Sequence, residues 1–281
     1  YLKGEWYGEE GQKLDITGCL LYAFAIFSLV YGASRMQSGV GVLLVLTGAV
    51  LLLIFVLQQK RSRYPVFEVA LFSANKVFTF SSFAALLNYS ASYAVTFLIS
   101  LYLQYMKGMS PQAAGSVLMA QPVVMALFSP FAGRLSDRIE PRLLATAGMT
   151  LTVIGVLLFS RVQPNTPLVL IVANLMLLGS GFALFSSPNM SAIMGAVEKH
   201  HYGLASGVVA TMRVLGQMCS MTVVTLVFAL FVGREAITPA NFDQFLQSIH
   251  TVFMISACFC LCGIYFSWFR GSVLSAEKSA L

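Results

Sequence analysis

Residues 129–142 read SPFAGRLSDRIEPR and carry five charged side chains within nine positions: Arg134, Asp137, Arg138, Glu140 and Arg142. On either side, residues 108–133 and 143–160 contain no Asp, Glu, Lys or Arg. A helix rises ~1.5 Å per residue, so roughly 20 apolar residues cross the ~30 Å hydrocarbon core of a bilayer. The charged stretch is therefore predicted to be a loop between two membrane-spanning helices.

The same pattern extends over the whole chain of 281 residues, which is 58% hydrophobic and 10% charged. Closed barrels are the other structure that crosses a membrane, but they show short alternating segments, whereas these runs are apolar on every face. We therefore predict an all-α polytopic membrane protein with about eight transmembrane helices. The eight charge-free runs are 16–34, 36–59, 77–106, 108–133, 143–160, 162–197, 214–233 and 244–269.

The net charge of +6 is explained by where the basic residues fall. If residue 1 lies in the cytoplasm, four basic residues lie outside, namely Arg35, Lys107, Arg161 and Arg234, and Arg213 falls inside or at the edge of a span. The other twelve of the 17 then lie in cytoplasmic segments. This bias follows the positive-inside rule and predicts that both termini are cytoplasmic. Nucleic acid is not an expected partner, and the lipid bilayer is.

Five cysteines lie within predicted spans: Cys19, Cys219, Cys258, Cys260 and Cys262. Cys258 and Cys262 share a helix face while Cys260 points elsewhere, so their spacing does not predict a metal site. Neither a metal nor another cofactor is expected. The spans also lack the His, Asp and Glu clusters of a membrane-embedded enzyme.

The runs divide into two plus six. We expect a cytoplasmic connector (1–14), a two-helix hairpin (15–59), a cytoplasmic linker with a short interfacial helix (60–76), a six-helix unit (77–270) and a cytoplasmic tail (271–281). Small residues within the spans, Gly179 with Gly181 and Gly203 with Gly207, predict close helix packing. Because the chain opens at Tyr1, without an initiator Met or a signal peptide, we expect it to be a fragment.

Two stretches resemble the major facilitator superfamily. The loop motif of that family, G-x-L-x-D-[RK]-x-G-[RK]-[RK], is matched by Gly133, Leu135, Asp137, Arg138 and Arg142, whereas Glu140 and Pro141 depart from it. Residues 186–217, SSPNMSAIMGAVEKHHYGLASGVVATMRVLGQ, are similar to a segment of the 14-helix drug:proton antiporters of that family. The resemblance implies two central helices followed by the C-terminal six-helix half, with an N-terminal half outside this sequence.

The resemblance implies a secondary active transporter that exports drugs or other amphipathic compounds by alternating access, in a bacterial or archaeal cytoplasmic membrane. All eleven acidic residues lie in loops, tails or helix ends. Proton coupling needs a shielded ionisable group, so its site is expected in the N-terminal half. An exporter of a defined metabolite, lipid or siderophore, and a non-transport membrane assembly subunit, are the alternatives.

Polar and aromatic side chains within spans are the candidates for a substrate cavity, although interhelical hydrogen bonds would use the same groups. Arg213 either reaches the cytoplasmic edge of its span or faces the translocation cavity. The candidates are Asn88, Tyr89, Tyr93, Gln104, Gln121, Asn174, Arg213 and Gln217.

The charged loop itself is the candidate cytoplasmic gate, formed by Gly133, Arg134, Asp137, Arg138 and Arg142. We expect the three arginines to surround Asp137, which lies near the positive N-terminal end of the next helix. Since Glu140 stands where the family motif has Gly, a change of Glu140 to Gly is expected to be mild. An ordinary positive-inside loop would explain the arginines but not the aspartate.

Overall fold

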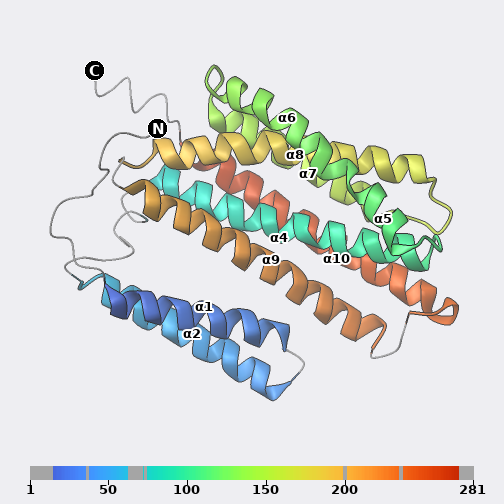
Figure 1. Ribbon diagram of the computed structural model, residues 1–281, viewed down its shortest axis with the longest axis horizontal. Helices are drawn as coiled ribbons and strands as arrows, with labels where there is room; N and C mark the ends of the chain where they lie inside the picture. Colours follow the sequence, from blue (N-terminus) through green and yellow to red (C-terminus); the bar gives the residue numbers. More distant parts are fainter. Residues whose placement is uncertain are drawn as a thin grey trace.

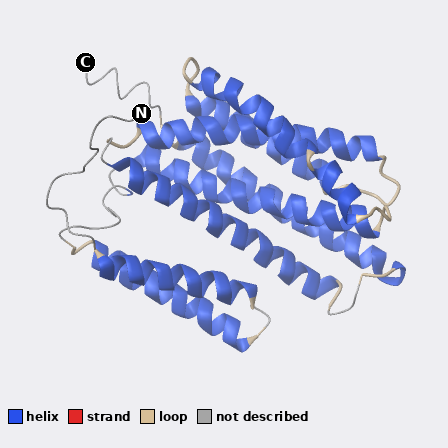
Figure 2. Cartoon of the chain, in the orientation of Figure 1, coloured by secondary structure: helices blue, strands red, loops and turns tan. Residues whose placement is uncertain are grey.

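A computed structural model describes residues 15–35, 38–62, 72, 75–198, 201–233 and 237–271. In this part of the chain all regular structure is helical, without a strand (Figure 2). The helices are α1 (Ile16–Ser34), α2 (Gly39–Gln59), α4 (Lys76–Tyr105), α5 (Pro111–Leu118), α6 (Ala120–Ser136), α7 (Pro141–Phe159), α8 (Leu168–Gly195), α9 (Tyr202–Phe231) and α10 (Phe242–Phe269), with a short 3₁₀ turn at Pro239–Asn241.

Helix starts follow polar residues that cap free backbone N–H groups. The side chains of Asp15, Ser38, Asn75 and Ser110 each accept a hydrogen bond from the backbone N–H three residues later. Such caps satisfy donors that have no partner within the helix. The boundaries of the spans are thus encoded locally, next to the charges that end each apolar run.

The predicted class of fold is confirmed. Seven helical segments of the described chain are long and apolar enough to cross a membrane, and α1 is a shorter apolar helix. One of the seven, Pro111–Ser136, is interrupted at Met119 between α5 and α6. Pro122 has no N–H to donate to the Leu118 carbonyl four residues earlier, and its ring crowds that carbonyl, so the helix breaks there.

The six-helix unit is built around α4, which packs against α9 and α10, while α8 packs against α6 and α7 (Figure 1). Gly148 on α7 allows a close contact with α8. A Cβ added there would lie 2.6 Å from the Gly181 carbonyl oxygen and 2.5 Å from the Phe185 nitrogen of α8. Gly179 likewise meets the Gln121 carbonyl, so close packing at Gly179 and Gly181 is confirmed.

Gly203 and Gly207 differ from this expectation. Both are exposed, and a Cβ added at either would meet no atom within 4 Å. The Gly-x-x-x-Gly spacing therefore does not mark a contact between helices of the described chain.

The hairpin of α1 and α2 lies beside α9, at the edge of the bundle in Figure 1. The two helices pack mainly on each other, and α1 reaches α9 through a hydrogen bond between the hydroxyls of Tyr22 and Thr211. Asp15 at the start of α1 accepts a hydrogen bond of 2.7 Å from the Gln59 amide at the end of α2. Both ends of the hairpin consequently lie on the same side. The expected interfacial helix in 60–76 falls mostly outside the described residues.

Candidate functional site

The charged loop joins α6 to α7 at one end of the bundle, which we call the motif end; Gly108 and Gly233 mark the far end. Asp137 is the C-cap of α6, and Asp137, Arg134 and Arg138 are all exposed. Within the described residues no basic nitrogen lies within 4 Å of the Asp137 carboxylate. The expected ring of arginines around Asp137 is therefore not formed, because Asp137 ends α6 and points to solvent instead of lying at the start of α7.

Glu140 takes the place that was expected for Asp137. It is the N-cap of α7, its side chain is 17% exposed, and its Oε2 lies 3.4 Å from Nε of Arg142. The Arg142 guanidinium in turn lies 5.7 Å from the ring centroid of Trp268 on α10. Glu140, one of the two residues that depart from the family motif, thus pairs with the arginine that contacts α10, and a change of Glu140 to Gly would remove this pair.

Behind this pair lies Arg270, the C-cap of α10, which is 1% exposed. Its Nη1 donates to Oδ1 of Asn189 on α8 at 2.9 Å and to the hydroxyl of Ser81 on α4 at 3.2 Å. The Asn189 amide donates to the Ser81 carbonyl at 3.1 Å, which closes the network. Sequence reasoning missed this cluster, because Arg270 stands in the sequence as the basic residue that ends a span.

The Arg270 guanidinium is only partly satisfied. Its Nε and Nη2 are buried and have no hydrogen-bond partner among the described residues, and the same holds for Oε1 of Glu140. Burial lowers the pKa of Arg270 to about 10; the negative charge of Glu140 opposes this shift and the positive charge of Arg142 adds to it. Arg270 is hence a buried cation near pH 7, with Glu140 as its compensating charge.

Two cavity candidates, Tyr89 and Arg213, come together in the middle of the bundle. The Arg213 guanidinium carbon lies 5.3 Å from the centroid of the Tyr89 ring, and that ring meets Phe182 edge to face at 5.5 Å. Gly216, one turn along α9, permits the approach of α9 to α4, since a Cβ there would lie 2.6 Å from the Leu86 carbonyl. Tyr89, Phe182 and Arg213 form what we call the central triad.

The contact with Tyr89 places the Arg213 head group near the mid-depth of the membrane-spanning helices. Tyr89 and Phe182 lie near the midpoints of α4 and α8. Arg213 is itself exposed within the described chain. A central arginine costs ~2.5–3.5 kcal/mol on insertion scales, and a cation–π contact gives back only about 0.5–2 kcal/mol. Because the contact with Tyr89 does not offset the whole cost, the guanidinium needs water or another polar partner.

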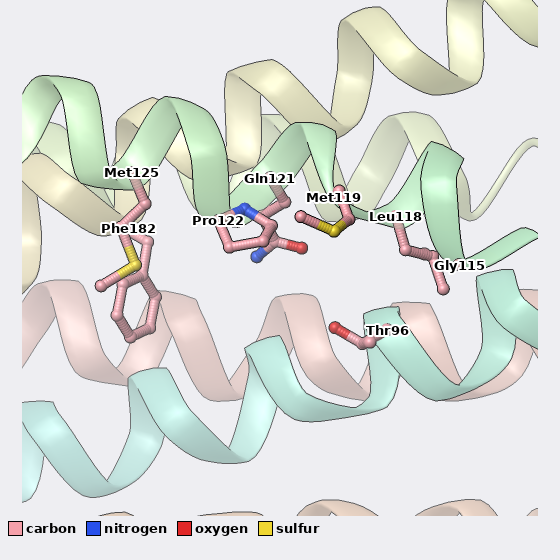
Figure 3. A pocket seen from close by; sticks show the side chains of 8 residues that line it. All are labelled: Thr96, Gly115, Leu118, Met119, Gln121, Pro122, Met125 and Phe182. Atoms are coloured by element: carbon pink, nitrogen blue, oxygen red, sulfur yellow. The ribbon is translucent and has the colours of Figure 1, made fainter.

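A groove of about 320 Å³ adjoins the central triad, and Phe182 belongs to both. Its lining comes from α4, from α8 and from both sides of the break at Met119 (Figure 3). Thr96 and Gln121 are its polar side chains, and the rest of the lining is apolar: Gly115, Leu118, Met119, Pro122, Met125 and Phe182. Of these, sequence reasoning found only Gln121, because the others look like ordinary lipid-facing or core residues.

The remaining candidates do not join this site. Asn88 is fully buried on the same face of α4 as Ala84 and Ala91, and neither amide atom has a partner among the described residues. Asn174 donates to the Gly155 carbonyl at 2.9 Å and so ties α8 to α7. Gln104 donates to Ser100 within α4. Tyr93 is exposed and Gln217 is half-buried, without a contact to the central triad that would define a role.

Among the described residues, no three His, Cys, Asp or Glu side chains lie close enough together to hold a metal ion. The site thus combines a groove, which has an apolar wall and two neutral polar groups, with the Arg213 cation, which lines a separate cavity of about 40 Å³ beside Tyr89. Such a combination is typical of small-molecule binding sites.

An all-helical membrane bundle with a groove of mixed apolar and polar lining is an architecture found in membrane transporters. The sequence model of the Major Facilitator Superfamily matches residues 81–280, which is more than half of the chain. The chain belongs to this superfamily.

Relatives of this chain carry names that state different functions. The chain is 26% identical over 261 residues to the riboflavin transporter RibZ of Clostridioides difficile, covering 93% of this chain and 57% of the relative. It is 27% identical over 235 residues to the multidrug resistance protein Stp of Mycobacterium tuberculosis, covering 80% and 42%. The lincomycin resistance protein LmrB of Listeria monocytogenes is 25% identical over 279 residues, covering 90% and 57%. The chain spans about half the length of these relatives.

A solved structure shares the fold. The bacterial homologue of the human lysosomal transporter Spinster, in an inward-facing and unoccupied conformation, matches with a TM-score of 0.59 at 14% identity. The match covers 90% of this chain and 66% of that structure.

Proposed function

We propose that this chain supplies a two-helix hairpin and one six-helix half of a secondary active transporter that exports small amphipathic compounds by alternating access. In this mechanism two bundles rock about a binding site near the midplane. The observation that carries the proposal is the groove between α4, α8 and the α5–α6 break. Its volume and its lining of apolar side chains with two polar groups suit a small amphipathic molecule.

Proton coupling is part of the proposal, and its site is assigned outside this chain. In the described chain acidic side chains occur only in helix caps, in a first turn or in a loop: Asp15, Asp137, Glu140, Asp243 and Glu198. None of these positions lies in the interior of a span, whereas a coupling carboxylate is expected there. Since the chain spans about half the length of its relatives, we assign the carboxylate to the other part of the whole transporter.

The loop from Gly133 to Arg142 is proposed as a gate on the cytoplasmic side of a bacterial membrane. The twelve-to-four bias of basic residues supports this orientation, with the motif end and the start of α1 in the cytoplasm. Because Asp137, Arg134 and Arg138 are exposed and without ion-pair partners in the described chain, they are available to pair across the mouth with the other half. Such pairs would favour the outward-facing state.

A transport assay tests the proposal. The full-length transporter is expressed in a bacterial strain without its main efflux pumps, and accumulation of fluorescent amphipathic dyes is measured with and without a protonophore. Lower accumulation that the protonophore restores is the expected result. Unchanged accumulation of every dye would contradict drug export.

The relation to RibZ favours a second candidate, a transporter dedicated to one metabolite such as a flavin. Movement of labelled riboflavin by the same cells, together with unchanged dye accumulation, would select this candidate over the first.

A further inference from the structure

Arg213 is the only charged side chain of the described helices that lies more than one turn from a helix end. The others, Lys76, Arg134, Arg142 and Asp243, lie in first or last turns. Within the described chain, the interior face of the six-helix unit therefore carries a single charge, and that charge is positive.

The guanidinium of Arg213 also has unused hydrogen-bonding capacity. Its contact with Tyr89 is a cation–π contact, with the guanidinium carbon 5.3 Å from the ring centroid. Arginine has five N–H donors in its plane, and in the described chain no oxygen accepts from any of them within hydrogen-bonding distance. These donors form a planar fork that matches carboxylate and phosphate groups.

An aromatic surface continues from this cation into the groove. Phe182 meets Tyr89 edge to face at 5.5 Å and also lines the groove, together with Met119, Met125 and Gln121. A planar ring can thus lie against Phe182 and the methionines while a group at its edge reaches toward Arg213. The groove volume of about 320 Å³ suits a small ring system.

We propose that the transported compound is a planar aromatic molecule that carries an anionic group, bound with its ring in the groove and its anion on Arg213. This inference rests on the proposed transport function and narrows it. A cationic amphiphile would meet a positive charge at this site, and the described helices carry no acidic side chain beyond their first and last turns to offset it.

Binding to the full-length transporter in nanodiscs tests the proposal with three fluorescent coumarins that differ in one group: an acetate, an acetamide or a trimethylammonium. We expect the acetate to bind about 10-fold or more tighter than the acetamide, and the ammonium to bind most weakly. Arg213→Gln should weaken the acetate about 10- to 100-fold and change the acetamide less than about 3-fold. Arg213→Lys should retain part of the preference for the acetate over the acetamide, because it keeps the positive charge.

Arg161→Gln is the matched control, since it removes the same charge from an exposed loop position near the far end. Its affinities should equal those of the unchanged protein. A wild-type preference for the ammonium, no preference for the acetate, or equal weakening of all three probes by Arg213→Gln would overturn the proposal. The transport proposal can fail separately. Absence of efflux in cells would refute transport without changing the charge-dependent binding measured here. Conversely, protonophore-sensitive export of cationic dyes would support transport while the preference for an anion was refuted.

Discussion

Replacing Glu140 by Gln should destabilise the motif end, because Glu140 compensates the charge of buried Arg270. The charged groups of Glu140 and Arg270 lie farther apart than the 4 Å of an ion pair. Unit charges 4 Å apart attract by ~4 kcal/mol at an effective dielectric constant of ~20, so this energy is an upper limit for their attraction. The neutral amide of Gln is less costly to bury than the Glu140 carboxylate, so the net loss of stability is smaller than the lost attraction. We expect Glu140→Gln to lower the free energy of unfolding by about 1–3 kcal/mol.

Asp137→Asn provides the matched control from the same loop. Asp137 is exposed and has no ion-pair partner in the described chain, so its change should stay within about 0.5 kcal/mol. The assay measures the fraction of monodisperse full-length transporter that survives heating in detergent. On the scale of soluble domains of comparable size, Glu140→Gln should lower the midpoint by roughly 3–10 °C.

A double-mutant cycle with Arg270→Met isolates the interaction between the two charges. Removal of Arg270 abolishes the buried cation but also two hydrogen bonds, so its own effect should stay within roughly 1–2 kcal/mol of zero. In that background Glu140→Gln should cost less than about 1 kcal/mol. Additive effects in the cycle, or equal midpoints for Glu140→Gln and Asp137→Asn, would refute the pairing.

Three further predictions concern topology, packing and transport. In a cysteine-free full-length protein, a single cysteine at Gly108 should react with an impermeant thiol reagent added outside the cell. A single cysteine at Ser62 should react only after permeabilisation, and the reverse pattern would show the opposite orientation. Gly148→Val should destabilise by more than about 3 kcal/mol or prevent folding, since its side chain would meet the α8 backbone, whereas Gly115→Val has open space and should keep normal expression. Asp137→Asn should leave expression intact and strongly reduce efflux at matched expression, and wild-type efflux would make the loop a topology signal alone.

Much of the fold could be predicted from the sequence, because span length and the placement of charges follow directly from the bilayer. The break at Met119 could have been predicted from Pro122, because this proline lacks an N–H and stands in the middle of a charge-free run. Gly179 and Gly181 behaved as small residues in membranes do, while Gly203 and Gly207 did not, since spacing alone cannot tell which helix face meets a neighbour.

The site was harder to predict, because it depends on which side chains meet across helices. Tyr89 and Arg213 were found as polar or aromatic residues in spans, but the contacts of Tyr89 with Arg213 and with Phe182 join α4 to α9 and to α8, which are far apart in the sequence. At the motif end the sequence pattern favoured Asp137, whereas the buried network uses Glu140 and Arg270. The carboxylates of Asp137 and Glu140 differ in burial, and a sequence motif does not encode burial.

The hydrogen bond between Asp15 and Gln59 has a consequence for how such a chain can evolve. It holds the first residue before α1 next to the last residue of α2, so the polypeptide leaves the hairpin on the side from which it entered. An insertion with an even number of crossings preserves the orientation of every helix that follows it. A gene could therefore gain or lose this pair of helices in one event without inverting the six-helix unit, and neither loop charges nor gate residues downstream would need to change sides.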